Sequence, residues 1–492
     1  MGPRRPRRVG GAGLLRSPRR GPGARPAGGR DDRLARPPRG GRPAIDPARE
    51  AAYEAVAAVH RDDAYANLVL PRILREGGVS GRDAAFATEL TYGTLRQIGT
   101  LDAIVAAAAD RPVDRIDPPV RDALRVGAYQ LLHMRVGAHA AVATTVDLVR
   151  SLVPGAAGFA NAVLRRIAEA DRSGWLARLA PADPVARAAL THAHPEWIVR
   201  AFVDALGSLD EAELALDADN LRPPVHLCAR PGLLTPAELA AALPGASVGR
   251  YSPYAVVLAG GGDPGAVAAV RDGRAHVQDE GSQLVAAALA GAPLDGRDDT
   301  WLDLCAGPGG KAGLLGALAA QRGAHVTAVE VAHHRAELVA RATEGLPVYT
   351  INADGRDVGK DPDLPAGGFD RVLVDAPCTG LGALRRRPEA RWRRQPSDLP
   401  PLTRLQRELL RAAFHAVRPG GLVAYVTCSP HQAETEVSVT EAARRSDVDV
   451  DLVDVRPYLP SSLPEAGTGP TVQLWPHRHG TDAMFVALLR RP

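Results

Sequence analysis

The chain has 492 residues, of which 45% are hydrophobic and 24% are charged, a composition typical of globular proteins. Its length suffices for two to four domains with hydrophobic cores, which excludes a fibre and a mini-protein. The net charge of +4 conceals an asymmetry, because the first 45 residues contain 13 arginines against only Asp31 and Asp32. The composition therefore predicts a basic arm in front of a mildly acidic globular part.

Four cysteines, at positions 228, 305, 378 and 428, are too few and too scattered for a disulfide framework. No CxxC pair or Cys/His cluster has the spacing of metal ligands, so we expect no metal site. This cysteine usage predicts a reducing, cytoplasmic setting. The basic N-terminal segment lacks the apolar run of a signal peptide, and no apolar run reaches about 18 residues, so we expect neither export nor a membrane span.

Residues 1–45 consist almost entirely of Arg, Gly, Pro and Ala. We expect them to be disordered, because they offer little apolar surface to offset the entropy of ordering. Such an arm could contact RNA phosphates, or it could be a dispensable solvated extension. From 46 to 172, apolar residues recur at spacings of three and four, which predicts five to seven short helices in an all-α domain.

Two further regions complete the chain. Residues 180–290 contain two helical stretches and two strand-like runs, VHLCARPG and AVVLAG, which predict a small α+β domain. Residues 291–492 alternate apolar strand runs with helices, the pattern of βαβ units around a mostly parallel, Rossmann-like sheet. The predicted fold class is therefore multi-domain: all-α, then small α+β, then α/β.

A glycine-rich turn follows the first strand of the α/β region. The segment TWLDLCAGPGGK runs from an apolar strand through Gly307, Gly309 and Gly310 into an apolar helix, and its Lys311 is one of only two lysines in the chain. Glycines let the backbone approach a ligand, and the helix N-terminus supplies free N–H groups. The spacing is neither GxGxxG nor Walker A, so a pyrophosphate is not the first choice of ligand.

Acidic residues follow the next three predicted strands, which end at Glu330, Asp354 and Asp375. The C-terminal ends of parallel strands lie at one edge of a sheet, so these acids and the glycine loop should line one crevice. Glu330 is placed to accept hydrogen bonds from ribose hydroxyls. Any single acid could be a helix cap, but the joint arrangement favours a nucleoside ligand without a polyphosphate, with S-adenosylmethionine as the leading candidate.

Two cysteines come after the fourth and fifth predicted strands, Cys378 in VLVDAPCTG and Cys428 in GLVAYVTCSP. A buried free cysteine is usually only a small apolar residue, but two at the ligand-binding edge favour catalysis. A thiolate that attacks carbon 6 of cytosine turns the ring into an enamine, which accepts a methyl group at carbon 5. Asp375 is placed to bind the polar edge of the base, which must be unpaired or flipped to reach these groups.

An arginine-rich segment, GALRRRPEARWRR, lies between the two cysteines. Its position beside Cys378 favours phosphate binding, although such a run can also be a solvated face. Trp392 could stack on a base or pack in the core. The side chains concerned are Arg385, Arg386, Arg387, Arg391, Trp392, Arg393 and Arg394.

These motifs resemble the RNA cytosine-5 methyltransferases of the Sun/Fmu (NOL/NOP/Sun) family, over about residues 46 to 490. DLCAGPGGK resembles the cofactor loop of that family, DAPCTGLGALRRRPEARWRR its fourth-strand signature and YVTCSP its second cysteine motif. VQDEGSQLVA and HGTDAMFVALLRR also look like family segments. Such a combination is highly specific.

The resemblance implies that Cys428, in the TC motif, is the nucleophile and that Cys378, in the PC motif, helps to release the product. Asp375 joins them in the predicted catalytic site because of its position at the end of the fourth strand, where it can bind the polar edge of the base. The resemblance also implies binding of S-adenosylmethionine by a set of residues at the strand ends: Cys305, Ala306, Gly307, Pro308, Gly309, Gly310, Lys311, Glu330, Asp354 and Asp375.

The region 46–172, with AYANLVLPRIL, looks like the NusB-type RNA-binding domain. Its fusion to the catalytic unit points to the RsmB-type branch, which implies methylation of one cytosine of 16S ribosomal RNA, free or partly assembled, by a cytoplasmic monomer. Two alternatives stay open: the same chemistry on transfer RNA, and a non-catalytic RNA-binding assembly factor that keeps the fold.

Two departures from the family pattern affect these expectations. Gly307 and Ala312 stand where Ala and Thr are usual, which should loosen the turn slightly without removing a needed donor. AETE at 433–436 stands where the family often has EENE, so a loop-holding role of that Asn is not carried over.

Overall fold

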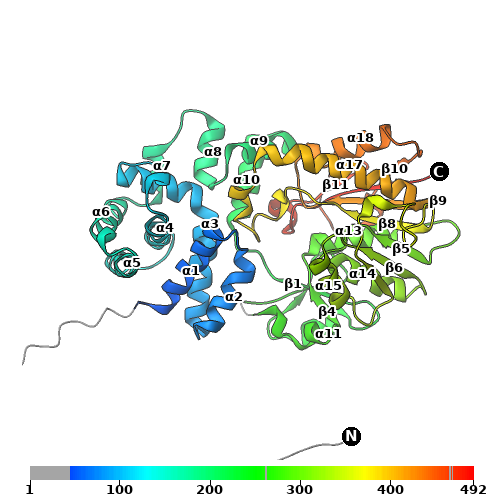
Figure 1. The fold of residues 1–492 in the computed structure, drawn as a ribbon, viewed down its shortest axis with the longest axis horizontal. Helices are drawn as coiled ribbons and strands as arrows, with labels where there is room; N and C mark the ends of the chain where they lie inside the picture. Colours follow the sequence, from blue (N-terminus) through cyan, green and yellow to red (C-terminus); the bar gives the residue numbers. More distant parts are fainter. Residues whose placement is uncertain (1–44, 261–262, 465–466, 468) are drawn as a thin grey trace, which may run out of the picture. The chain divides into compact units, whose positions relative to one another are not determined.

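The computed structural model describes residues 45–260, 263–464, 467 and 469–492 (Figure 1). The predicted arm, apart from Ile45, lies outside the described residues. From Ile45 to Pro492 the chain packs as one unit, so its regions share interfaces.

Seven helices open the described chain. The first begins where the side chain of Asp46 accepts a hydrogen bond from Arg49 N and Pro47 occupies the first turn. Trp175 belongs to the same apolar core as the preceding helices, so this core continues past residue 172. The helices are α1 (Pro47–Arg61), α2 (Ala66–Glu76), α3 (Gly81–Ala109), α4 (Pro118–His133), α5 (Ala138–Leu152), α6 (Ala157–Ile167) and α7 (Arg172–Leu179).

Helix α3 has 29 residues, so the prediction of uniformly short helices is wrong for it. Gly93 is an interior residue of this helix, at the point where α4 packs closely against it. A Cβ atom at Gly93 would come within 2.0 Å of the Tyr129 ring. The glycine is therefore a close-packing position and not a helix end.

Residues 180–290 are built around two apolar cores. A four-stranded antiparallel sheet, in the order β2-β3-β1-β4, packs with α11 and α12 around Leu227, Leu239 and Val256. Helices α8 to α10 instead share a core with Leu381 and Trp475 of the last region. The elements are α8 (Pro184–His192), α9 (Glu196–Leu206), α10 (Leu209–Asn220), β1 (His226–Ala229), α11 (Pro236–Ala241), β2 (Ser247–Val248), β3 (Ala255–Val257), α12 (Ala268–Arg271) and β4 (Ala275–Val277).

The last region is an eight-stranded sheet in the order β10-β12-β9-β8-β5-β6-β7, with β11 paired to β12. Strands β5 to β9 are mutually parallel, and β10, β11 and β12 are antiparallel to their neighbours. The strands are β5 (Thr300–Asp303), β6 (His325–Val329), β7 (Val348–Ile351), β8 (Phe369–Asp375), β9 (Val417–Thr427), β10 (Asp451–Val453), β11 (Val472–Gln473) and β12 (Phe485–Arg490).

Helices cover both faces of this sheet (Figure 1). Trp301 and Val326 pack with α13 and α14 on one face, and Val374 packs with α17 and α18 on the other. Burial on both faces explains why these strands are nearly continuous apolar runs. The helices are α13 (Glu280–Gly291), α14 (Gly310–Ala320), α15 (His333–Ala342), α16 (Ala390–Arg393), α17 (Leu399–Ala416), α18 (Glu436–Arg444) and α19 (Pro476–His479).

The predicted fold class is confirmed: a helical region, a small α+β region and a mostly parallel α/β sheet follow one another. Among the helices of the described ranges, none is both long and apolar enough to cross a membrane. Strand order reverses between β5 and β8, because β6 lies on the other side of β5. Ligands of open α/β sheets bind at the carboxyl ends of the strands beside such a point.

Candidate active site

The two cysteine thiols meet at the carboxyl ends of the neighbouring strands β8 and β9. Cys428 directly follows β9, and Cys378 lies three residues beyond β8. Their Sγ atoms are 3.4 Å apart, and both cysteines are free thiols. The sheet register, which pairs Asp375 with Val426, explains why the two loops leave the sheet side by side.

The surroundings polarise this pair. The hydrogen bond from Cys378 lowers the pKa of Cys428, burial and Asp375 oppose this, and the positive charges of Lys311 and Arg387 lower it further. The same hydrogen bond, together with burial, raises the pKa of Cys378 well above its usual value. Cys428 is therefore the thiol of the pair that ionises more readily, with the Cys378 S–H as its hydrogen-bond donor.

Lys311 and Asp375 form an ion pair next to the thiols. Lys311 lies in the first turn of α14, and its Nζ donates to Asp375 Oδ2 at 2.8 Å. Burial acts to lower the pKa of Lys311, but Asp375 raises it above its ordinary value, so the side chain stays cationic. Asp303, at the end of β5, is fully buried, and burial together with Asp375 raises its pKa to about 7.

The glycine loop is held against the next strand. Ala306 N donates to Val329 O at 2.9 Å, and Gly309 N donates to Ala306 O at 2.7 Å. Gly309 has φ +109°, and a Cβ atom there would lie 2.7 Å from the Cβ of Ala342. Only glycine fits this position, for both backbone and space.

The other residues of this loop differ in what they contribute. A Cβ atom at Gly307 would lie 2.1 Å from Glu330 Oε2, so this departure from the family pattern leaves room for the carboxylate. A cis peptide bond joins Gly307 to Pro308, and Gly310 opens α14. The Cys305 thiol packs against the apolar core, and burial raises its pKa well above the usual value.

Arginines engage both outer acids. Glu330 is buried, its Oε1 accepts from Ala332 N, and its Oε2 lies 3.5 Å from Arg335 Nη1. Arg335 also donates to Gly307 O at 2.6 Å. Asp354 accepts hydrogen bonds from the backbone and guanidinium of Arg356, which lower its pKa.

Two buried side chains hold the Cys378 loop, and the sequence patterns did not single them out. Glu434 accepts hydrogen bonds from Thr379 N at 2.8 Å, from the Thr379 hydroxyl and from Gln406 Nε2 at 3.1 Å. Gln406 Nε2 also donates to Pro377 O at 2.9 Å. The AETE segment was the sequence signal that could have pointed to Glu434, which is its second residue. Thr435, which stands where the family often has Asn, donates only to carbonyls of its own turn.

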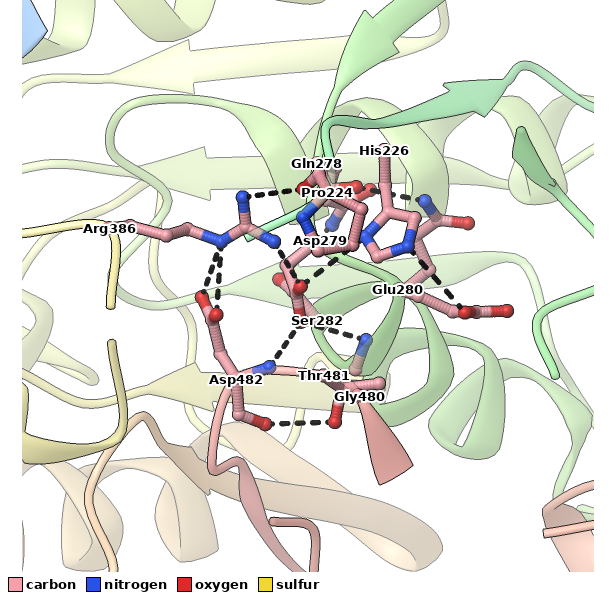
Figure 2. Close-up of polar contacts among 12 residues, drawn as sticks. Pro224, His226, Gln278, Asp279, Glu280, Ser282, Arg386, Gly480, Thr481 and Asp482 are labelled. Atoms are coloured by element: carbon pink, nitrogen blue, oxygen red, sulfur yellow. Dashed lines mark hydrogen bonds and ion pairs between the residues drawn. The ribbon is translucent and has the colours of Figure 1, made fainter. Parts of the chain in front are cut away.

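A buried ion cluster supports the same loops from behind. Figure 2 shows Arg386 between Asp279 and Asp482. Asp279 Oδ2 accepts from Arg386 Nη2 at 2.6 Å and from Arg385 Nη2 at 3.1 Å, while its Oδ1 accepts from Asp482 N at 2.9 Å. Burial opposes the ionised state, but Arg386, His226 and Arg385 hold the pKa of Asp279 well below its usual range.

This cluster connects to the nucleophile loop through Gly382. Gly382 N donates to Cys428 O at 2.9 Å, and Ala483 N donates to Gly382 O at 2.8 Å. A Cβ atom at Gly382 would lie 2.1 Å from Ala483 O, so only glycine allows the three segments to meet. The VQDEGSQLVA and HGTDAMFVALLRR segments therefore act as supports of the cysteine loops.

The prediction that the arginine-rich segment binds phosphate is wrong for most of it. Besides Arg385 and Arg386, the fully buried Arg391 donates to the carbonyls of Arg96 and Asp219. Arg393 donates to Val59 O and Ala64 O of the helical region. The sequence could not show this, because the carbonyl acceptors are about 170 to 330 residues away along the chain.

Three members of the segment remain. Trp392 packs against the apolar core of the helical region, and a Cβ atom at Gly99 would lie 2.4 Å from the Trp392 ring. Of the two predicted roles, core packing is therefore correct and base stacking is not. Arg394 lies 3.9 Å from Asp398. Arg387 is exposed and forms no ion pair within the described part of the chain.

Comparisons with known proteins agree with this architecture. The family model described as 16S rRNA methyltransferase RsmB/F matches residues 292–490, and the NusB family model matches residues 46–169. Rv1407 of Mycobacterium tuberculosis, whose name mentions a methyltransferase without a substrate, is 60% identical over 91% of this chain and 97% of its own.

A relative and a solved structure extend this similarity. Ribosomal RNA small subunit methyltransferase B of Pseudomonas putida is 37% identical over 80% of this chain and 89% of its own. The crystal structure of PH0851 shares the fold, with a TM-score of 0.76 and 24% identity over 92% of this chain and all of that one. The chain therefore belongs to the RsmB/F family of S-adenosylmethionine-dependent ribosomal RNA methyltransferases.

Proposed function

We propose that this protein transfers the methyl group of S-adenosylmethionine to carbon 5 of one cytosine in 16S ribosomal RNA, through a covalent adduct with Cys428. The observation that carries this proposal is the polarised thiol pair, with 3.4 Å between the Sγ atoms, beside the Lys311–Asp375 ion pair. The thiolate is the nucleophilic form of cysteine, and a lowered thiol pKa increases the fraction of Cys428 in that form. Two thiols in one hydrogen-bonded pair also match a reaction in which a thiolate must first attack and then leave.

The residues around the glycine loop fit the cofactor. No side chain caps the N-terminus of α14, and the buried Asp303 Oδ2 has no hydrogen-bond partner among the described residues, so it suits a cationic amino group. Arg335 and Arg356 are 44% and 46% exposed, so they can move aside from the two outer acids. We propose that the cofactor is held by Cys305, Ala306, Gly307, Pro308, Gly309, Gly310, Lys311, Glu330, Asp354 and Asp375.

Attack of the Cys428 thiolate on carbon 6 forms a sulfur–carbon bond and moves the ring π electrons toward carbon 5. Asp375 Oδ2 is taken by Lys311, which leaves Oδ1 to accept from the cytosine amino group or the protonated ring nitrogen. When bound, S-adenosylmethionine supplies an electrophilic methyl group that the activated carbon 5 can take. Lys311 balances the negative charge that collects around the thiolate and the carboxylates.

For product release, the proton on carbon 5 passes to a water molecule, its C–H electron pair restores the 5,6 double bond, and the bond between Cys428 and carbon 6 breaks to return the thiolate. The Cys378 S–H, which faces Cys428 Sγ, stabilises the departing thiolate by the hydrogen bond that lowers its pKa. Cys378 therefore assists elimination rather than attack. The loop contacts of Glu434 and Gln406 keep its thiol in place.

The choice of ribosomal RNA rests on the NusB-like region and on the names of the relatives. We propose the division 46–172, NusB-like and RNA-binding; 180–290, a small RNA-binding domain; and 291–492, catalytic. The proposal includes a cytoplasmic monomer that acts on free or partly assembled small-subunit RNA.

Bisulfite sequencing of ribosomal and transfer RNA, from cells with and without the gene, tests this function. We expect the loss of one 5-methylcytosine in 16S ribosomal RNA. Loss of a transfer RNA mark would keep the chemistry and change the substrate. No lost mark would contradict the catalytic function and favour an RNA-binding assembly factor.

A further inference from the structure

Helix α2 presents a stripe of exposed aromatic, apolar and basic side chains, with one acidic residue, Glu76, at its C-terminal end. Tyr65, the N-cap residue, is 48% exposed, and Leu68 is 68% exposed. The exposed Arg72 and Arg75 follow at spacings of four and three, so all four side chains lie on one face of the helix. Val69 and Leu70 are buried, so they attach the helix to its domain.

This stripe begins beside the catalytic loops. The Arg387 guanidinium lies 5.9 Å from the centroid of the Tyr65 ring, and that of Arg393 lies 5.3 Å from it. Arg387 comes five residues after Gly382, whose N–H donates to Cys428 O, and a turn through Ala383 O holds Arg387 N. The positive charge of Arg387 also acts to lower the pKa of Cys428. Arg387 thus connects the stripe to the surroundings of the thiol pair.

The basic members of the stripe are available for a polyanion. Within the ranges that the structure describes, Arg72, Arg75 and Arg387 form no ion pair, and all three are exposed. Arg393 differs, because it binds two backbone carbonyls and lies 3.7 Å from Asp63. Guanidinium groups without ion pairs, beside a half-exposed aromatic ring, match the phosphates and bases of single-stranded RNA.

We propose that Tyr65, Leu68, Arg72, Arg75 and Arg387 form a track, the α2 track, for the single-stranded RNA that flanks the target cytosine. This inference rests on the proposed function. Arg387 binds the phosphate nearest the target, and Tyr65 with Leu68 takes a neighbouring base by stacking. Arg72 and Arg75 bind phosphates further along, over about 15 Å at 1.5 Å per residue. The helical region thereby contributes directly to recognition at the catalytic centre.

The test uses the full chain and an RNA oligonucleotide that carries the target sequence. The variants are Tyr65→Ala, Tyr65→Phe, Arg387→Gln and the double variant Arg72→Gln, Arg75→Gln. Arg165→Gln is the matched control, because Arg165 is exposed on α6 and forms no ion pair within the described residues. RNA affinity is measured against salt concentration, and KM is measured separately for RNA and for S-adenosylmethionine.

We expect Tyr65→Ala to raise the RNA Kd about tenfold, as for loss of one stacked base, and Tyr65→Phe to stay near wild type. The double arginine variant should lower the slope of log affinity against log salt by about 1.4, which is about 0.7 for each lost phosphate contact. Arg387→Gln should lower it by about 0.7 and also slow methyl transfer. KM for S-adenosylmethionine and the behaviour of Arg165→Gln should not change.

Track variants that bind RNA like Arg165→Gln, with an unchanged salt slope, would overturn the α2 track. The α2 track would also be overturned if Tyr65→Phe raised the RNA Kd as much as Tyr65→Ala does. A third contrary result would be variants that lower kcat and leave KM for RNA unchanged. Wild-type protein that binds the RNA through these residues but transfers no methyl group would instead contradict the proposed function, because the affinity measurement does not depend on chemistry.

Discussion

Removal of the Cys378 thiol tests the coupling of the two cysteines. Cys378→Ala deletes the donor that lies 3.4 Å from Cys428 Sγ. A hydrogen bond to a charged group contributes about 1.5–3 kcal/mol, and one pKa unit corresponds to about 1.4 kcal/mol. Since a thiol is a weak donor, the lower value applies, and the pKa of Cys428 should rise by about 1 unit. At a pH below both pKa values, the thiolate fraction then falls about tenfold.

The assay is the rate of iodoacetamide alkylation of Cys428 against pH, followed by mass spectrometry of the peptide that contains it. Alkylation needs the thiolate, so the midpoint of the profile reports the pKa, and a raised pKa moves the profile to higher pH. Cys378→Ser is the matched control, because its hydroxyl still donates and should restore a midpoint close to wild type. A midpoint that stays in place or moves to lower pH in Cys378→Ala would refute the assigned hydrogen bond.

The same variant has a second expected effect. Without the Cys378 donor, the Cys428 thiolate becomes a poorer leaving group, so a covalent protein–RNA adduct should accumulate as a slow band on a denaturing gel. The double variant Cys378→Ala, Cys428→Ala should show no such band. Normal product release without an adduct would show that the release role of Cys378 is wrong.

Four further predictions concern separate parts of the chain. Cys428→Ala should abolish methyl transfer from radiolabelled cofactor to RNA, and unchanged turnover would exclude it as the nucleophile. Gly309→Ala should lose cofactor binding in equilibrium dialysis, because φ +109° and the contact with Ala342 leave no room for a Cβ; retained binding would contradict the assigned loop. Asp279→Asn leaves Arg385 and Arg386 with Asp482 as their remaining carboxylate partner, so urea unfolding should show a loss of about 3 kcal/mol, the lower end of the cost of breaking a buried ion pair. The pKa of Asp279 is lower in the folded state than in the unfolded state, so its ionisation stabilises the fold above the unfolded pKa of about 4. This stabilisation is lost as the pH falls below that value. The unfolding free energy of the wild type should therefore fall more steeply in acid than that of Asp279→Asn. Deletion of residues 1–45 should leave the melting temperature unchanged and at most weaken RNA affinity in a salt-dependent manner; a large fall in melting temperature would contradict a disordered arm.

Much of the fold and of the site geometry follows from local patterns. Each parallel strand of the α/β region is a short apolar run, and the glycine loop, the acidic residues and the cysteines follow the strand ends. In a parallel sheet these ends lie at one edge, so the residues after them are neighbours. This is why the glycine loop, Asp375, Cys378 and Cys428 could be predicted as neighbours from spacing alone. The small α+β region was likewise visible as strand runs between helices, although its division into two cores was not.

What the sequence alone determined is thus the order of the elements and the set of groups at the strand ends, because both depend on periodicity over a few residues. Only the tertiary structure decided the use of the arginine-rich segment. Arg391 and Arg393 reach carbonyls of the helical regions, Arg386 binds Asp279 and Asp482, and Arg387 alone stays exposed without an ion pair among the described residues. These arginines are close in sequence and chemically identical. The hydrogen-bond partner of each one therefore depends on tertiary packing, which places a distant carbonyl or carboxylate next to some of them and not next to others.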